Sequence, residues 1–273
     1  MPPDESSVEP QVEPQVMRNP EITYDSLLGG RLRLRQLASG HRAGTDALLL
    51  AALTPPDTRG MVLDVGAGAG AVGLVAAFRA PCAHIGLVEI DKMACALARD
   101  NIQANALEAR LSVYQADILA PASRRAAGLV DEQAALVLTN PPFFDAGSVR
   151  VTPDSARARA HVAAAPLADW LRASLALLAP GGVFAMIHRA DALADCLGSI
   201  GRRLGSLRIR PVQPRVDSPA SRVLFYGVKG SKGPLRLEAP LVLHERDGRF
   251  TPEAMRLALD ASLTIFPDDR NLA

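Results

Sequence analysis

From Met61 onward, short apolar runs and helical patterns of apolar and polar positions follow one another, which predicts a parallel sheet covered by helices on both faces. Short apolar runs bounded by turn residues are typical of buried strands, and apolar positions three and four residues apart indicate helices. Strand and helix patterns follow one another in turn, as in α/β folds. The predicted strands are residues 62–65, 85–89, 111–114, 135–139, 183–187, 207–211 and 223–228. The predicted helices are residues 71–79, 92–105, 167–178 and 191–204.

The last two of these strands are predicted to pair antiparallel at one end of the sheet. Residues 212–221, which separate them, have no helical pattern, and a parallel connection would need a crossover. The fold class is therefore α/β, a Rossmann-like seven-stranded sheet that is mostly parallel and ends in an antiparallel hairpin. The tail beyond it predicts one more strand, 241–244, and a helix, 252–263.

Three regions are expected along the chain. Residues 1–21 are rich in proline and carboxylates and predict a disordered leader, because such a segment buries little apolar surface. Residues 22–57 form an extension in which Arg31, Arg33 and Arg35 alternate with leucines, a pattern typical of a strand with one basic face. Residues 58–273 hold the sheet described above.

Composition narrows the class of protein without deciding it. The 273 residues are 48% hydrophobic, and the net charge is +1; this apolar content suffices for a large core. The leader holds five carboxylates and one arginine, a charge of −4, so the rest of the chain carries +5. This charge permits a nucleic-acid partner. The sequence shows neither a secretion signal nor an apolar run long enough to span a bilayer, so we expect a soluble cytoplasmic protein without membrane contact.

The three cysteines do not predict a metal or redox site. Cys82, Cys95 and Cys196 are odd in number and widely spaced, with no Cys-x-x-Cys pair. We expect them to be small core residues and expect no bound metal. The single tryptophan, Trp170, lies on the apolar side of the helix predicted over 167–178 and is also expected in the core.

A glycine-rich turn follows the first strand of the sheet. Residues 64–70 read Asp-Val-Gly-Ala-Gly-Ala-Gly and open a helix, so Gly66, Gly68 and Gly70 can let a ligand approach the backbone. A dinucleotide fingerprint would need Gly-x-Gly-x-x-Gly, and Gly73 does not fit that register. Asp64 at the start of the motif suits a cofactor that carries an amino acid.

Two carboxylates end the next two strands. Glu89 ends the strand that follows the glycine turn and its helix, where a carboxylate can accept hydrogen bonds from both ribose hydroxyls. Asp117 follows the third strand and is placed to accept from the adenine amine of the cofactor, or else to cap the turn at Ile118. Ile90 would lie beside Glu89 in the same site.

The most specific signal is Asn140-Pro141-Pro142-Phe143, directly after an apolar strand. Two prolines fix a rigid turn at the carboxyl end of the strand, where α/β sheets bind ligands. An exocyclic amine is a poor nucleophile, and two acceptors that hold its hydrogens direct its lone pair toward a methyl donor. We expect the Asn140 side-chain oxygen and the Pro141 carbonyl to be these acceptors, with Phe143 stacked on the base for about 1–3 kcal/mol.

These motifs, with the upstream Gly44-Thr45-Asp46, resemble the bacterial tRNA (adenine-N6)-methyltransferases that modify adenosine 37, beside the anticodon, of valine tRNA. The resemblance runs from about Leu34 to the end of the chain, and phenylalanine at 143 departs from the tyrosine that relatives often carry. It implies a class I methyltransferase sheet, S-adenosylmethionine as the donor and the anticodon region of tRNA as the substrate. It also implies that Thr45 and Asp46 lie over the donor, although either residue can instead cap a helix over 47–53. The residues expected to bind the donor are Thr45, Asp46, Asp64, Gly66, Ala67, Gly68, Gly70, Glu89, Ile90, Asp117, Ile118 and Asn140.

Basic residues on two segments are candidates for RNA contact. One group lies on the extension, which would cover the mouth of the donor and RNA site, and the other lies in the loop after Phe143. A solvated surface is the competing interpretation for both groups. The candidates are Arg31, Arg33, Arg35, His41, Arg42, Arg150, Arg157 and Arg159.

Other functions stay open on the sequence. A protein glutamine N5-methyltransferase uses the same Asn-Pro-Pro turn, and adenine in rRNA or DNA is an alternative acceptor. Outside this class, a nicotinamide-dependent oxidoreductase or a catalytically silent RNA-binding module would also explain parts of the pattern. The sequence does not reveal the oligomeric state.

Overall fold

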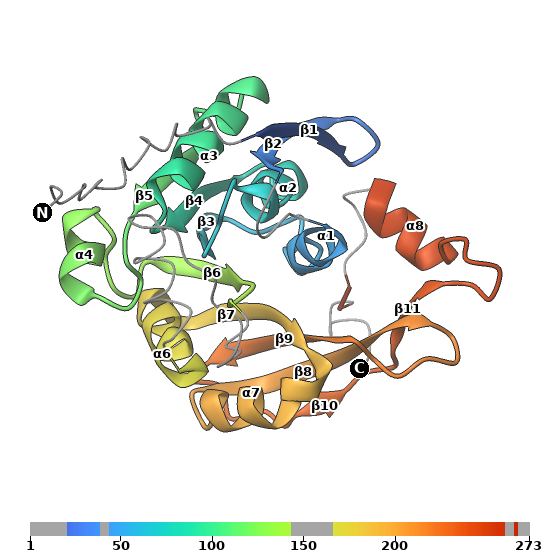
Figure 1. Cartoon of the computed structure of the whole chain (residues 1–273). Coiled ribbons are helices and arrows are strands. Elements are labelled where there is room, and N and C mark those ends of the chain that lie inside the picture. Colours follow the sequence, from blue (N-terminus) through green and yellow to red (C-terminus); the bar gives the residue numbers. More distant parts are fainter. Residues whose placement is uncertain (1–20, 39–43, 143–165, 260–264, 267–273) are drawn as a thin grey trace, which may run out of the picture.

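The structure, a computed structural model, describes residues 21–38, 44–142, 166–259 and 265–266 (Figure 1). The strands of the main sheet are β3 (Gly60–Val65), β4 (Ala83–Glu89), β5 (Leu111–Gln115), β6 (Ala134–Thr139), β7 (Leu178–Arg189), β8 (Leu204–Arg215), β9 (Arg222–Lys229), β10 (Arg236–Leu237) and β11 (Leu241–His244). The helices are α1 (Thr45–Ala51), α2 (Ala71–Arg79), α3 (Lys92–Ala104), α4 (Pro121–Ala126), α6 (Leu167–Leu177), α7 (Leu193–Ile200) and α8 (Pro252–Leu259), with a 3-10 turn η1 (Ala190–Ala192). A separate antiparallel hairpin joins β1 (Ile22–Leu27) to β2 (Leu32–Leu37).

The nine strands of the main sheet, counted over the described residues, run in the order β10-β8-β9-β7-β6-β3-β4-β5, and β11 also pairs with β8. Pairing is parallel from β5 through β7, while β9 is antiparallel to both β7 and β8. This order confirms the predicted α/β sheet, which is mostly parallel and contains an antiparallel hairpin. The hairpin is not the outermost part of the sheet, however, because β10 and β11 add parallel to β8.

Apolar side chains fill both faces of the sheet, which explains the continuous apolar runs of its strands. On β6, Leu136 and Leu138 pack in the core beneath α1, α2 and the hairpin, and Val137 packs in the core beneath α6 and α7. Figure 1 shows these two groups of helices on opposite sides of the sheet. No helix in the described part of the chain is long and apolar enough to cross a bilayer.

Several elements differ from the predicted bounds. The helix predicted over 191–204 begins as a 3-10 turn and ends at Ile200, where Gly201 has a positive φ of 54°. This backbone conformation is not helical and is readily accessible only to glycine, so the helix stops there. Strands β1 and β10 and helix α4 were not predicted. The cysteines meet expectation in part: Cys95 and Cys196 are buried, whereas Cys82 is exposed.

The start of α1 also differs from expectation. Thr45 and Asp46 were predicted as possible caps, but both lie inside the first turn, and Gly44 is the N-cap residue. No side chain in the described part of the molecule caps this helix. The Asp46 carboxylate instead forms an ion pair, described below.

Candidate active site

The parallel strands β3, β4, β5 and β6 bring the predicted motifs to one edge of the sheet. Neighbouring strands of a parallel sheet end at the same edge, where α/β proteins bind ligands. Because β3 lies between β4 and β6, the glycine turn after β3 has Glu89 on one side and Asn140 on the other. The two most informative sequence motifs are therefore neighbours in the fold.

The glycine turn has a backbone that side chains would block. Gly66, Gly68 and Gly70 have φ values of 78°, 55° and 90°, in the left-handed region that favours glycine. A Cβ atom on Gly70 would lie 2.8 Å from the Leu87 side chain, and one on Gly66 would lie 3.0 Å from Trp170. A Cβ atom on Gly68 would have no atom of the described chain within 4 Å apart from its chain neighbours, so side chains crowd the turn at both ends but not in its middle.

Asp64 is a buried carboxyl group beneath this turn. Only 1% of the residue is exposed, and its Oδ2 accepts a hydrogen bond of 3.0 Å from the Gly73 backbone N–H. Burial raises the pKa of Asp64 to about 7, and the nearby Glu89 charge adds to the increase, whereas the Gly73 bond opposes it. Gly73, which did not fit a dinucleotide motif, is thus the donor that holds Asp64.

Glu89 lies against the glycine turn from the β4 side. Its Oε2 accepts from the Gly68 N–H at 2.8 Å, and its Oε1 accepts from the N–H groups of Ile90 and Asp91, also at 2.8 Å. Asp91 then caps α3 through Met93 and Ala94. The carboxylate predicted for ribose binding is therefore held rigidly beside the open part of the turn.

Asp117 caps the turn at Ile118, which was the alternative role expected for it from the sequence. Its Oδ1 accepts from the Leu119 N–H at 2.9 Å, and its own N–H donates to Ser123 Oγ at 3.0 Å. Ile118 beside it is buried. A capping role leaves the second carboxylate oxygen for a ligand, so the two interpretations of Asp117 are compatible.

Asn140 presents a buried acceptor that has no donor among the described residues. Asn140 directly follows β6, and the next residue, Pro141, is buried. Its Oδ1 is inaccessible to solvent and makes no hydrogen bond within the described chain. An unpaired buried acceptor costs about 1–3 kcal/mol, a cost that a donor group on a bound ligand would relieve. Phe143 lies outside the described residues.

The Asp46 carboxylate reaches the same edge of the sheet from the extension. Its Oδ2 accepts from Arg222 Nε at 2.8 Å. Arg222 opposes Arg189 at the end of β7, the strand that runs parallel to β6. Arg222 was not predicted from the sequence, because only the antiparallel return of β9 brings it back to this edge.

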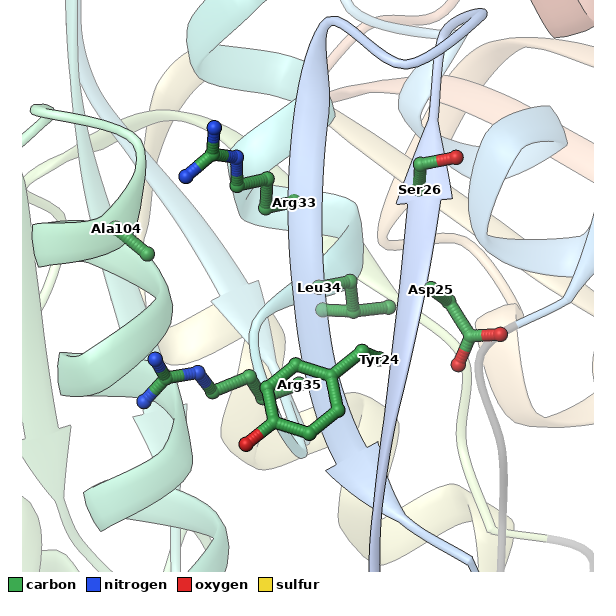
Figure 2. A pocket seen from close by; sticks show the side chains of 7 residues that line it. All are labelled: Tyr24, Asp25, Ser26, Arg33, Leu34, Arg35 and Ala104. Atoms are coloured by element: carbon green, nitrogen blue, oxygen red, sulfur yellow. The ribbon is translucent and has the colours of Figure 1, made fainter.

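The outer surface of the β1–β2 hairpin forms a pocket, shown in Figure 2. We call the lining side chains Tyr24, Ser26, Arg33 and Arg35 the hairpin face; they border a cavity of about 380 Å³. Tyr24 is 76% exposed, and the Arg35 guanidinium lies 5.5 Å from its ring centroid. Arg35 also lies 3.7 Å from the Asp100 carboxylate. The face thus combines an exposed ring with two cations; Asp100 lies beside it, and Asp25 also lines the cavity.

The other candidates for RNA contact lie elsewhere. Arg31 lies over the Phe78 ring, and it donates to the carbonyl groups of Leu28 and Leu259. It therefore links the hairpin to α8 and does not share the hairpin face. The remaining candidates fall outside the described residues: His41, Arg42, Arg150, Arg157 and Arg159.

Two asparagines, one in α3 and one at its C-cap, hold the backbone of β2. Asn101 accepts from the Arg35 N–H and donates to the Arg35 carbonyl, at 2.7 and 2.8 Å. Asn105 makes the same pair of bonds with Arg33, at 2.8 Å each. Asn101 also donates to the Ala69 carbonyl in the glycine turn, at 2.9 Å. The hairpin and the glycine turn are thus joined through one buried amide.

The sequence of this chain is similar to those of known methyltransferases. A model of the methyltransferase small domain matches residues 41–190. The tRNA1(Val) (adenine(37)-N6)-methyltransferase of Porphyromonas gingivalis is 31% identical, over 83% of this chain and 91% of that protein. The protein of the same name from Aeromonas hydrophila is 32% identical, over 79% of this chain and 88% of its own length.

Solved structures share the fold. A predicted O-methyltransferase from Agrobacterium tumefaciens is 32% identical, with a TM-score of 0.67 over 80% of this chain and 97% of that chain. TYW2 from M. jannaschii, solved in complex with AdoMet, has a TM-score of 0.51 over 77% of this chain and 86% of its own, at 13% identity. The second likeness concerns the fold alone.

Proposed function

Because the chain belongs to the tRNA1(Val) (adenine(37)-N6)-methyltransferase family, we propose that it methylates N6 of adenosine 37 in tRNA1(Val). The observation that carries this proposal is Asn140, whose buried Oδ1 lacks a donor within the described chain at the edge of the sheet that also bears the glycine turn. An adenine N6 amine supplies such a donor. Because its substrate would be tRNA, we also propose that the protein acts in the cytoplasm.

The residues around the glycine turn fit S-adenosylmethionine (AdoMet) as the methyl donor. The turn is open at Gly68, so a ligand can approach its backbone, and the Glu89 carboxylate beside it can accept from ribose hydroxyls. Asp64 lies below the turn, and its pKa is raised. The positive charge of the methionine part of AdoMet would favour the ionised form of this carboxyl group. When bound, AdoMet supplies an electrophilic methyl group on a sulfonium.

Asn140 and Pro141 would prepare the amine for methyl transfer. The lone pair of an exocyclic amine is delocalised into the ring, so the free amine is a weak nucleophile. Asn140 Oδ1 and the Pro141 carbonyl would each accept one N–H, which orients the nitrogen and stabilises the positive charge that develops on it. The alkylated amine then loses a proton readily to water. This route requires no strong base and no metal ion.

Methylation of a defined RNA tests the proposal. The purified protein, AdoMet and an unmodified tRNA1(Val) transcript should yield N6-methyladenosine at position 37, detected by mass spectrometry of nucleosides and mapped by ribonuclease fragments. A transcript with guanosine at position 37 is the control and should stay unmodified. Absence of N6-methyladenosine from every RNA offered would contradict the proposal. An O-methylated product would favour the activity named for the Agrobacterium structure.

We also propose that the hairpin face contacts the tRNA backbone and a base. Arg33 and Arg35 can pair with phosphates, and an exposed tyrosine ring such as Tyr24 is a surface on which an unpaired base stacks. The backbone of both arginines is fixed by Asn105 and Asn101, so less conformational freedom is lost when they bind.

Replacing Arg33 with alanine tests this face. We expect tRNA affinity to fall by about 3- to 10-fold at low salt, and the slope of log K against log salt to decrease by about 1, as for the loss of one phosphate contact. AdoMet affinity should not change. Arg202→Ala, at an exposed arginine after α7, is the matched control and should leave tRNA affinity as in the parent. Equal losses in both variants would indicate a general charge effect and refute the assignment.

Asn101 and Asn105 form a matched pair for testing the link to the glycine turn. Each side chain makes three hydrogen bonds, but the third bond of Asn101 reaches Ala69 in the turn, whereas that of Asn105 reaches the Asn101 carbonyl. We expect Asn101→Ala to weaken AdoMet binding by about 10-fold and to lower the free energy of unfolding by about 3 kcal/mol. We expect Asn105→Ala, whose bonds to β2 are exposed, to leave AdoMet affinity unchanged. Its free energy of unfolding should fall by about 1 kcal/mol.

Calorimetric titration and urea unfolding measure both quantities for the two asparagine variants. Both variants loosen β2, so a difference between their AdoMet affinities reports on the Ala69 bond. Equal AdoMet affinity in the two variants would show that this bond does not shape the donor site.

A further inference from the structure

A buried hydrogen-bonded bridge joins the end of β6 to the end of β3. Trp170 Nε1 donates to Thr139 Oγ1 at 2.9 Å, and Thr139 Oγ1 donates to the Val65 carbonyl at 2.9 Å. Thr139 is fully buried and directly precedes Asn140. Val65 is equally buried and directly precedes Gly66. The bridge therefore connects the residues that enter the two halves of the proposed active site.

The indole of Trp170 also supports the glycine turn. Trp170 lies on α6, is 3% exposed, and its ring packs so close to Gly66 that an added Cβ would lie 3.0 Å from Cζ2 and 3.2 Å from Cη2. The Gly66 N–H is held in turn by β4, because it donates to the Val88 carbonyl at 2.9 Å. The Trp170 side chain thus contacts both Gly66, in the turn proposed to bind the methyl donor, and Thr139, which precedes the asparagine proposed to bind the target amine.

The Asn140 side chain has little else among the described residues to fix it. Its Oδ1 makes no hydrogen bond there, so its position follows from the backbone at residues 139–141. Methyl transfer needs the amine nitrogen in line with the sulfonium methyl, and a misplacement of about 1 Å can cost about 100-fold in rate. The distance between the ends of β6 and β3 therefore decides how well amine and methyl group align.

We propose that Thr139 and Trp170 are positioning residues that fix the Asn140 corner relative to the glycine turn. The inference rests on the proposed function, because it concerns the same transfer reaction. Neither residue needs to touch the amine or the donor. Thr139 is required for its hydroxyl, which is both acceptor and donor in the bridge, and Trp170 is required for its N–H and its ring.

The competing interpretation is an ordinary core contact, which would affect stability alone. Ser174 lies on α6 one turn after Trp170, and its buried hydroxyl has no hydrogen-bond partner in the described chain. Ser174→Ala therefore removes a buried hydroxyl from the same helix without touching the bridge. It is the matched control for the loss of the Thr139 hydroxyl.

The kinetic test compares Thr139→Val, Thr139→Ser, Trp170→Phe and Ser174→Ala in methylation of the tRNA1(Val) transcript. We expect Thr139→Val to lower kcat by about 30- to 100-fold, with KM for AdoMet and for tRNA within about 3-fold of the parent. Thr139→Ser keeps the hydroxyl and should stay within about 3-fold of the parent kcat. Trp170→Phe keeps an apolar ring and should lower kcat by about 10-fold. Ser174→Ala should leave kcat unchanged.

A readout independent of turnover is the order of the Asn140 side-chain amide, measured by ¹⁵N NMR relaxation with sinefungin bound. We expect the Asn140 amide to be ordered in the parent and in Thr139→Ser, and mobile on the nanosecond timescale in Thr139→Val. A Thr139→Val protein with an ordered amide, or with kcat within about 3-fold of the parent, would overturn the inference. If the parent methylates no RNA, the proposed function fails, and the order of the Asn140 amide alone decides the role of the bridge.

Discussion

Replacing Asn140 with alanine should lower kcat by about 100- to 1000-fold while AdoMet affinity and folding stability stay near those of the parent. The rate falls because one of the two acceptors that hold the amine is lost, and the loss of one such preorganised group typically has this magnitude. Stability is preserved because Asn140 Oδ1 has no hydrogen bond to lose among the described residues. Single-turnover kinetics, calorimetric titration with AdoMet and thermal unfolding measure the three quantities.

Gln133→Ala is the matched control for this variant. Gln133 directly precedes β6 at its other end, and its buried Nε2 likewise has no partner in the described chain. The control removes an unpaired amide from beside the same strand and should leave kcat unchanged. A kcat for Asn140→Ala within about 10-fold of the parent would exclude the acceptor role. A large loss of stability together with AdoMet affinity would show that Asn140 is structural.

Asp64→Asn should remove the contribution of this carboxyl group to the dependence of stability on pH between about pH 4 and pH 7. The pKa of Asp64 is about 7 in the folded protein and 3.8 in its ordinary state, so the folded state binds the proton more tightly. The resulting stabilisation is fully present below about pH 4 and is lost as pH rises through the folded pKa, by about 4 kcal/mol in total. Asparagine keeps an oxygen for the Gly73 N–H and does not ionise.

The measurement is the difference in unfolding free energy between the parent and Asp64→Asn at several pH values. We expect the unfolding free energy of the variant to increase relative to that of the parent as pH rises toward 7. At higher pH the difference between the two should stay constant. Parallel curves for the two proteins would show that Asp64 does not titrate in this range. In the parent, AdoMet binding should also weaken as pH falls below 7, because the donor's positive charge favours the ionised carboxylate.

The sequence allowed the central sheet to be predicted because strands buried on both faces give continuous apolar runs. The bounds of strand β6 were predicted closely, and the glycine turn, Glu89 and Asn140 were expected at one edge from the rule for parallel strands. Strand β1 was not predicted because its sequence has no apolar run. The strand is half exposed, and Tyr24 lies on its solvent side. Its register is set by β2 and not by its own pattern.

Contacts between distant segments were not predictable from local patterns. Arg222 and Asp46 are far apart in the sequence, and only the antiparallel return of β9 brings them together. Trp170 was expected to be buried, which is confirmed, but its bond to Thr139 depends on how α6 crosses the sheet. The unpaired oxygen of Asn140 likewise follows from what surrounds it and not from the motif.

The asparagines of α3 and its C-cap have a consequence beyond the donor site. A two-stranded ribbon exposes rows of backbone N–H and C=O groups on both sides, and such rows can recruit strands from other molecules. Along β2, the amides of Asn101 and Asn105 occupy the N–H and C=O of alternate residues as a neighbouring strand would. The helix thereby closes that side of the ribbon to intermolecular pairing, and the extension can remain a small, separate hairpin without promoting aggregation.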